Sequence, residues 1–97
     1  MIKKRNMSTG KMFKNFGITG KEIEIMFRDM PDPLFNHFFM PAKVLEEYNK
    51  YLVVEIQPHY NPYNYQGISK PYRWGVNKTC LWSGDTIIKY KGKKVIQ

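Results

Sequence analysis

The residues best suited to binding chemistry lie between residues 57 and 74, in the stretch QPHYNPYNYQGISKPYRW. This stretch holds four tyrosines, one tryptophan and three prolines without a regular period, which is typical of a long loop. Rings that stack on bases, next to cations that follow the phosphates, are what binding of single-stranded nucleic acid requires. The rings and cations interleaved here and just beyond are Tyr60, Tyr63, Tyr65, Lys70, Tyr72, Arg73, Trp74 and Lys78.

The same loop fits two other interpretations. Tyrosine, asparagine, arginine and tryptophan give rigid contact surfaces to protein-binding loops. Alternatively, the rings fold back onto the domain and enlarge a small core. The three prolines fit every interpretation, because each lowers the entropy of a fixed irregular path.

A catalytic role is a third possibility for this region. His59, Tyr60, Arg73 and Lys78 provide the proton-transfer groups and phosphate-stabilising cations of a metal-independent ribonuclease. The other histidine, His37, lies 22 residues from His59, and neither has a neighbour at metal-ligand spacing. The glycines are scattered as turn residues and form no phosphate-binding loop. We therefore expect no metal and no cofactor, and a binding protein rather than an enzyme.

Positive charge is concentrated at the two ends of the chain, whose net charge is +8. The first 21 residues contain six basic and no acidic residues, residues 22–55 have an excess of acids, and from residue 56 onward seven basic residues face Asp85 alone. Such segregation attracts polyanions or an acidic protein surface, although a solvated lysine coat gives the same composition. The binding hypothesis requires lysines from both ends to converge beside exposed rings.

Length and hydropathy predict one small domain over residues 1–97, with residues 1–7 not required to be ordered. The longest apolar runs are far shorter than a membrane span, and the first residues carry charge without the apolar stretch of a signal peptide. We expect a cytoplasmic protein without a membrane partner. Cys80 is the only cysteine, so it forms no intramolecular disulfide, and its apolar neighbours predict a buried thiol.

The first half of the chain is predicted to be helical. A short helix starts at Ser8 or Thr9 and ends at Gly17. A second starts at the capping box of residues 19–22 and continues to residue 30 with apolar residues at helical spacing. A third begins at Pro41.

The second half is predicted to be mainly β-strand. Residues 53–56, 77–82, 86–90 and 93–97 are rich in β-branched and aromatic residues, and turn sequences separate the last three segments. The expected fold class is therefore α+β, with N-terminal helices packed on a small C-terminal antiparallel sheet.

Residues 8–30 contain Met12, Phe16, Ile18, Ile23 and Met26 at positions expected to be buried and Gly17 at a turn. With this pattern the segment resembles a helix-turn-helix motif. The resemblance implies that Thr19, Lys21, Glu22 and Glu24 face base edges in the major groove while Lys11 and Lys14 contact phosphates. An ordinary helical hairpin with a glycine turn is the alternative.

The leading hypothesis is a small non-enzymatic protein whose basic, tyrosine-rich surface engages nucleic acid or a nucleoprotein complex. Its binding residues are Lys11, Lys14 and Lys21 together with the rings and cations from Tyr60 to Lys78. The alternative is an inhibitor or adaptor, of the kind phages and mobile elements encode, that holds a protein partner through residues 57–74. The third hypothesis is the metal-independent ribonuclease toxin.

Overall fold

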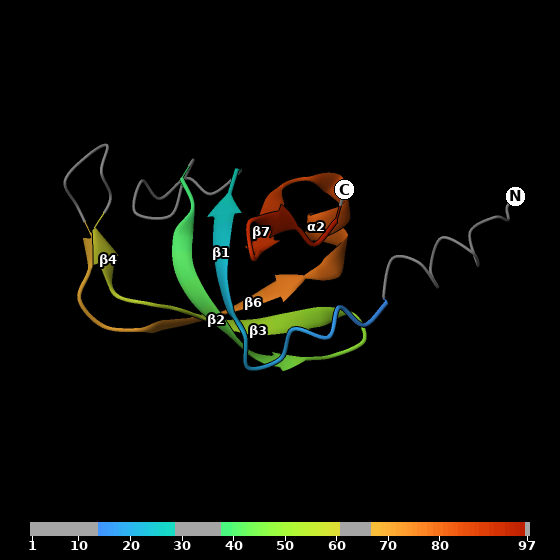
Figure 1. The fold of residues 1–97 in the computed structure, drawn as a ribbon, viewed down its shortest axis with the longest axis horizontal. Coiled ribbons are helices and arrows are strands. Elements are labelled where there is room, and N and C mark those ends of the chain that lie inside the picture. The colour runs from blue at the N-terminus through green and yellow to red at the C-terminus, as the bar shows by residue number, and fades with distance from the viewer. Residues whose placement is uncertain (1–13, 29–37, 61–66, 97) are drawn as a thin grey trace, which may run out of the picture.

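The computed structural model describes residues 14–28, 38–60 and 67–96, which form a mostly β structure (Figure 1). Six strands make one antiparallel sheet in the order β6-β3-β2-β1-β7-β8, and β4 and β5 form a separate hairpin. The elements are β1 (Glu22–Phe27), β2 (Met40–Glu47), β3 (Tyr51–Ile56), β4 (His59–Tyr60), β5 (Gly67–Ile68), β6 (Tyr72–Asn77), α2 (Lys78–Ser83), β7 (Thr86–Tyr90) and β8 (Lys93–Lys94).

The α+β prediction with N-terminal helices is wrong, because the segment expected as the second helix contains β1. Ile23, Ile25 and Phe27 are buried while the residues between them are exposed or half-buried, which is the alternation of a strand. The apolar positions of this short segment match both a helical and a strand period, and pairing with β2 and β7 on either side selects the strand. The second helix that the helix-turn-helix resemblance requires is therefore a strand from Glu22 to Phe27.

The helix predicted to begin at Pro41 is also wrong, because this segment is β2. Pro41 lies opposite Gln57 of the neighbouring chain segment. Gln57 N donates to the Pro41 carbonyl oxygen at 2.9 Å, but Pro41 has no N–H to donate in return. The Gln57 carbonyl oxygen would accept a hydrogen bond from any residue other than proline at position 41. Here it lies 2.8 Å from His59 Nδ1. The strand therefore tolerates a proline where β3 ends and the chain turns into the β4–β5 hairpin.

Residues 78–83 show the opposite error: the predicted strand over 77–82 is mostly the helix α2. Lys78 and Leu81 are buried at i and i+3, so one face of this short helix packs against the protein. Gly84 ends it in the left-handed conformation, with φ of 87°. The strand expected over 86–90 coincides with β7, and those expected over 53–56 and 93–97 overlap β3 and β8.

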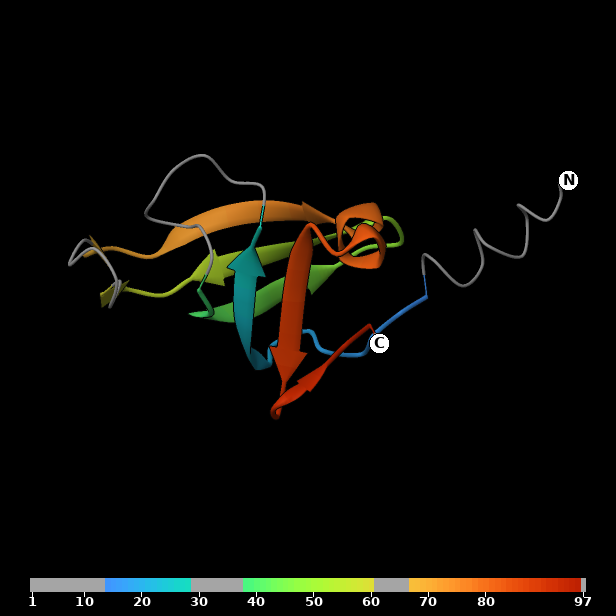
Figure 2. The same ribbon diagram turned by 90° about the horizontal axis from the view of Figure 1, so that it is seen from above.

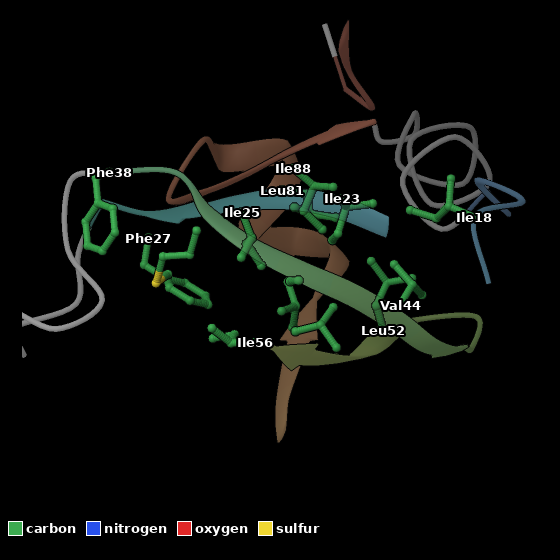
Figure 3. Packing of buried hydrophobic residues seen from close by; sticks show 14 residues of the cluster. Ile18, Ile23, Ile25, Phe27, Phe38, Val44, Leu52, Ile56, Leu81 and Ile88 are labelled. Carbon is green, nitrogen blue, oxygen red and sulfur yellow. The ribbon is translucent and has the colours of Figure 1, made fainter. Parts of the chain in front are cut away.

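The sheet bends so that β1 and β7 cross the direction of β3 and β6 (Figure 2). The long strand β2 belongs to both parts: β1 pairs with its first half, and β3 pairs with Ala42–Glu47 across an irregularity between Val44 and Glu46. Figure 3 shows the apolar side chains packed between the two parts, with Ile25, Val44, Leu52 and Ile88 essentially inaccessible to water. Cys80, expected to be buried, is half-buried.

Candidate anion-binding groove

Lysines from the beginning and the end of the chain line one groove of about 560 Å³, called here the lysine groove. One wall is formed by residues 14–18, which precede β1, and the other by the end of β7, the following turn and the start of β8. The two segments lie near each other in the view of Figure 2, and side chains of both line the same groove. The lining residues include no acidic side chain. The groove is lined by Lys14, Asn15, Phe16, Ile18, Tyr90, Lys91, Lys93, Lys94 and Val95.

A tight turn fixes the lysines of the C-terminal wall. Lys91 and Gly92 have φ of 54° and 80°, so both central residues of this two-residue loop are left-handed, as in a type I′ hairpin turn. Tyr90 pairs with Lys93 across the hairpin, and Lys89 lies directly opposite Lys94. Like charges opposite each other destabilise a sheet, and Lys89 Nζ lies instead over the Phe39 ring, 4.2 Å from its centroid.

A buried ion pair holds the N-terminal wall. Lys78 Nζ lies 3.0 Å from Glu47 Oε2, and only 1% and 3% of the two side chains is exposed. The carboxylate of Glu47 accepts hydrogen bonds from Phe16 N at 2.6 Å and Gly17 N at 3.1 Å. Lys78 Nζ also donates to the carbonyl oxygen of Lys14 at 2.8 Å. Backbone groups of Lys14, Phe16 and Gly17 are thus hydrogen-bonded to the Glu47–Lys78 ion pair, whose members come from β2 and α2.

Ammonium groups lie near the two aromatic rings of the groove. Lys78 Nζ is 5.0 Å and Lys14 Nζ 5.9 Å from the centroid of the Phe16 ring. On the opposite wall, Lys91 Nζ is 5.3 Å from the centroid of Tyr90. These distances are typical of cation–π contacts, which hold the ammonium groups in place. The rings thus help to position the lysines, and the lysines are the groups that attract an anion.

The groove brings several positive charges close together. The ion pairs seen among the described residues, Arg73–Glu55 and Lys78–Glu47, do not involve Lys14, Lys91 or Lys93. Positive side chains in a concave surface focus the electrostatic potential and raise the local concentration of anions. The arrangement suits a ligand with several negative charges.

The predicted aromatic residues lie elsewhere. Tyr60 is 65% exposed on β4, Tyr72 is exposed at the start of β6, and Trp74 is half-buried between Tyr72 and Phe27, at ring distances of 5.6 and 5.9 Å. The β4–β5 hairpin projects from the end of the molecule remote from the N-terminal wall (Figure 1). Part of the ring set therefore packs on the sheet and part is exposed. Lys11, Tyr63 and Tyr65 lie outside the described residues.

The predicted cations are divided between these two regions. Lys70 is exposed before β6, and Arg73 is exposed and pairs with Glu55 at 3.7 Å. Lys21 is exposed just before β1. Of the predicted cations that the structure describes, Lys14 alone lines the lysine groove, and Lys78 contacts two of the lining residues, Lys14 and Phe16, from outside it.

The ribonuclease set is not assembled. Lys78 follows the last residue of β6 and Tyr72 is the first, so the six-residue strand, about 17 Å at 3.3 Å per residue, separates Lys78 from the hairpin end. His59 Nδ1 is bonded to a backbone carbonyl, and Nε2 is buried without a hydrogen-bond partner among the described residues. His59 packs on Phe38 at a ring distance of 5.5 Å.

Sequence reasoning missed Phe16, Tyr90, Lys91, Lys93 and Lys94 as site residues. The signal was present in KYKGKK at residues 89–94, where a glycine turn places several lysines on one hairpin. It also missed two exposed, stacked rings, Tyr48 and Tyr51, whose centroids are 4.8 Å apart at the β2–β3 turn. Their stacking depends on the strand pairing that the helix prediction excluded.

Neither a metal site nor a membrane-spanning helix is found in the part of the chain that the structure describes. These residues contain no group of three histidine, cysteine, aspartate or glutamate side chains placed to bind a metal ion. No helix among them has the length and apolar character needed to cross a bilayer. Comparison of the sequence with models of protein families and with curated proteins finds no match.

Proposed function

We propose that this protein is a non-enzymatic nucleic-acid-binding protein and that the lysine groove contacts the phosphate backbone. The observation that carries the proposal is the convergence of Lys14 with Lys91, Lys93 and Lys94 in a groove without acidic lining residues. Because ammonium groups already lie near the rings of Phe16 and Tyr90, charge makes a larger contribution than base stacking. Binding is then weakly dependent on sequence and strongly dependent on salt.

The salt dependence gives a quantitative test. With four lysines each neutralising one phosphate, the slope of log K against log salt is about −2.8 for a single strand and about −3.6 for a duplex. Raising the salt from about 50 to 200 mM should therefore weaken binding roughly 50- to 150-fold. Fluorescence anisotropy with labelled single-stranded and duplex oligonucleotides of equal length measures both slopes.

A matched pair of variants locates the contact. Lys14→Gln/Lys93→Gln removes one lysine from each wall and should make the slope less negative by about 1.4 for a single strand. Lys43→Gln/Lys50→Gln removes the same charge from exposed positions outside the groove and should leave the slope unchanged. Equal effects of the two double variants would mean that the protein's overall charge, and not this groove, binds the nucleic acid.

The exposed hairpin supports a second candidate, a protein partner held through residues 57–74. Tyr60 is 65% exposed on a β4–β5 hairpin that extends from the sheet. A contact of this kind would retain most of its affinity at high salt and would lose mainly association rate. Salt dependence therefore distinguishes the two functions.

A further inference from the structure

The ion pair of Glu47 and Lys78 is unusual in where its hydrogen bonds go. Glu47 is the last residue of β2 and Lys78 the first of α2, and both side chains are almost completely buried. Burying two charges is costly unless good geometry and further hydrogen bonds compensate it. Here the further bonds are made to one short segment, residues 14–17.

The next residues of the chain are anchored independently of the pair. Ile18 is buried in the core, and Gly20 N donates to the carbonyl oxygen of Val44 at 2.7 Å. Lys21 N donates to the Ile18 carbonyl oxygen at 3.0 Å. Loss of the ion pair should therefore release residues 14–17 and leave the chain from Ile18 onward in place.

Residues 14–17 include three lining residues of the lysine groove, Lys14, Asn15 and Phe16. We propose that Glu47 and Lys78 are positioning residues for nucleic-acid binding: the ion pair holds Lys14 against the groove and does not itself contact the ligand. This inference rests on the proposed function. The sequence suggested that Lys78 contacts phosphates. In this proposal Lys78 instead positions Lys14, which contacts the phosphate.

A variant that adds positive charge distinguishes a positioning role of the ion pair from general electrostatic attraction. Glu47→Gln makes the protein more positive, so general attraction alone would strengthen binding of an oligonucleotide. If the pair positions Lys14, Glu47→Gln instead weakens binding by the same factor as Lys14→Gln. Glu46→Gln is the matched control, because it makes the same charge change at the neighbouring exposed residue and should not weaken binding.

The salt slope and a double-mutant cycle test the mechanism. Glu47→Gln should make the single-strand slope less negative by about 0.7, the value for one phosphate contact. Adding Lys14→Gln to Glu47→Gln should cause no further change, since both remove the same contact. Trypsin should also cleave after Lys14 faster in Glu47→Gln than in the unmodified protein. Where Glu47→Gln does not fold, the charge-neutral Glu47→Leu/Lys78→Met variant is measured by the same criteria.

The outcomes are distinguishable. If the unmodified protein shows no salt-dependent binding of oligonucleotides, the proposed function is overturned and the positioning role with it. If the unmodified protein binds and Glu47→Gln binds equally or more tightly, while trypsin shows the segment released, the positioning role alone is overturned. Weaker binding with additive effects of Lys14→Gln and Glu47→Gln also overturns it, because the two residues would then act separately.

Discussion

Removing one member of the buried ion pair should destabilise the protein severely. In Lys78→Met the Glu47 carboxylate stays buried, with the backbone N–H groups of Phe16 and Gly17 as its remaining donors among the described contacts. Breaking a buried pair in this way costs about 3–5 kcal/mol, against a total stability on the order of 5–15 kcal/mol for a domain. Even the lower figure should reduce the melting temperature by roughly 12–24 °C at this chain length.

Removing both members should cost much less. Glu47→Leu/Lys78→Met leaves no buried charge, and apolar side chains of similar size restore packing, so its free energy of unfolding should lie within about 1 kcal/mol of the unmodified protein or above it. The difference between the single and the double variant therefore measures the penalty of an unpaired buried charge.

Thermal and urea unfolding followed by circular dichroism measures these free energies, and agreement of the two methods checks two-state behaviour. Two results would refute the reasoning. One is a loss below about 1 kcal/mol in Lys78→Met, which would mean that water reaches the pair and screens it as at a surface. The other is a double variant as unstable as the single one, which would mean that the pair stabilises through its own attraction.

Two further predictions concern the hairpin and the β2–β3 turn. Gly67→Ala should disrupt the β4–β5 hairpin, because an added Cβ would lie 2.2 Å from the carbonyl oxygen of His59. Hydrogen exchange should then show lost protection of the hairpin amides and unchanged protection of the amides in the main sheet. The hydrogen bond that the Tyr48 hydroxyl donates to Glu46, with smaller contributions from burial and nearby charge, raises the pKa of Tyr48. Glu46→Gln should therefore lower this pKa toward its ordinary value in a spectrophotometric titration, and an unchanged titration would contradict the bond.

The sequence predicted strands well where turn chemistry bounds them. Residues 86–90 lie between the turn residues of Gly84-Asp85 and Lys91-Gly92, and the predicted strand coincides with β7. The N-terminal half has weaker boundaries, and a six-residue segment such as Glu22–Phe27 satisfies a helical and a strand period equally. Pairing with β2 and β7 makes this segment a strand, and such long-range pairing cannot be inferred from the local sequence.

Burial of charge was likewise beyond local inference. Lys78 is one of many lysines in the sequence, and its partner Glu47 lies 31 residues earlier. The tertiary structure shows that this lysine is enclosed, because pairing of β3 with β6 and the hydrogen bond from Lys78 N to the Lys50 carbonyl oxygen bring the start of α2 to the β2–β3 turn. The binding hypothesis required lysines from both ends of the chain to converge, and Lys14 lies with Lys91 and Lys93 in one groove. The rings beside them are Phe16 and Tyr90, and not those of the 57–74 loop.

Two features beside the lysine groove are arranged as binding of an anion would require. On one wall, Lys94 lies opposite another lysine, Lys89, where an acidic residue would stabilise the pairing, and the Lys89 ammonium lies outside the groove, 4.2 Å from the centroid of the Phe39 ring. The other wall is held by a buried ion pair, which apolar residues of similar volume would replace without loss of stability. A polyanion bound between the walls would relieve the repulsion on one side and would need the fixed geometry on the other.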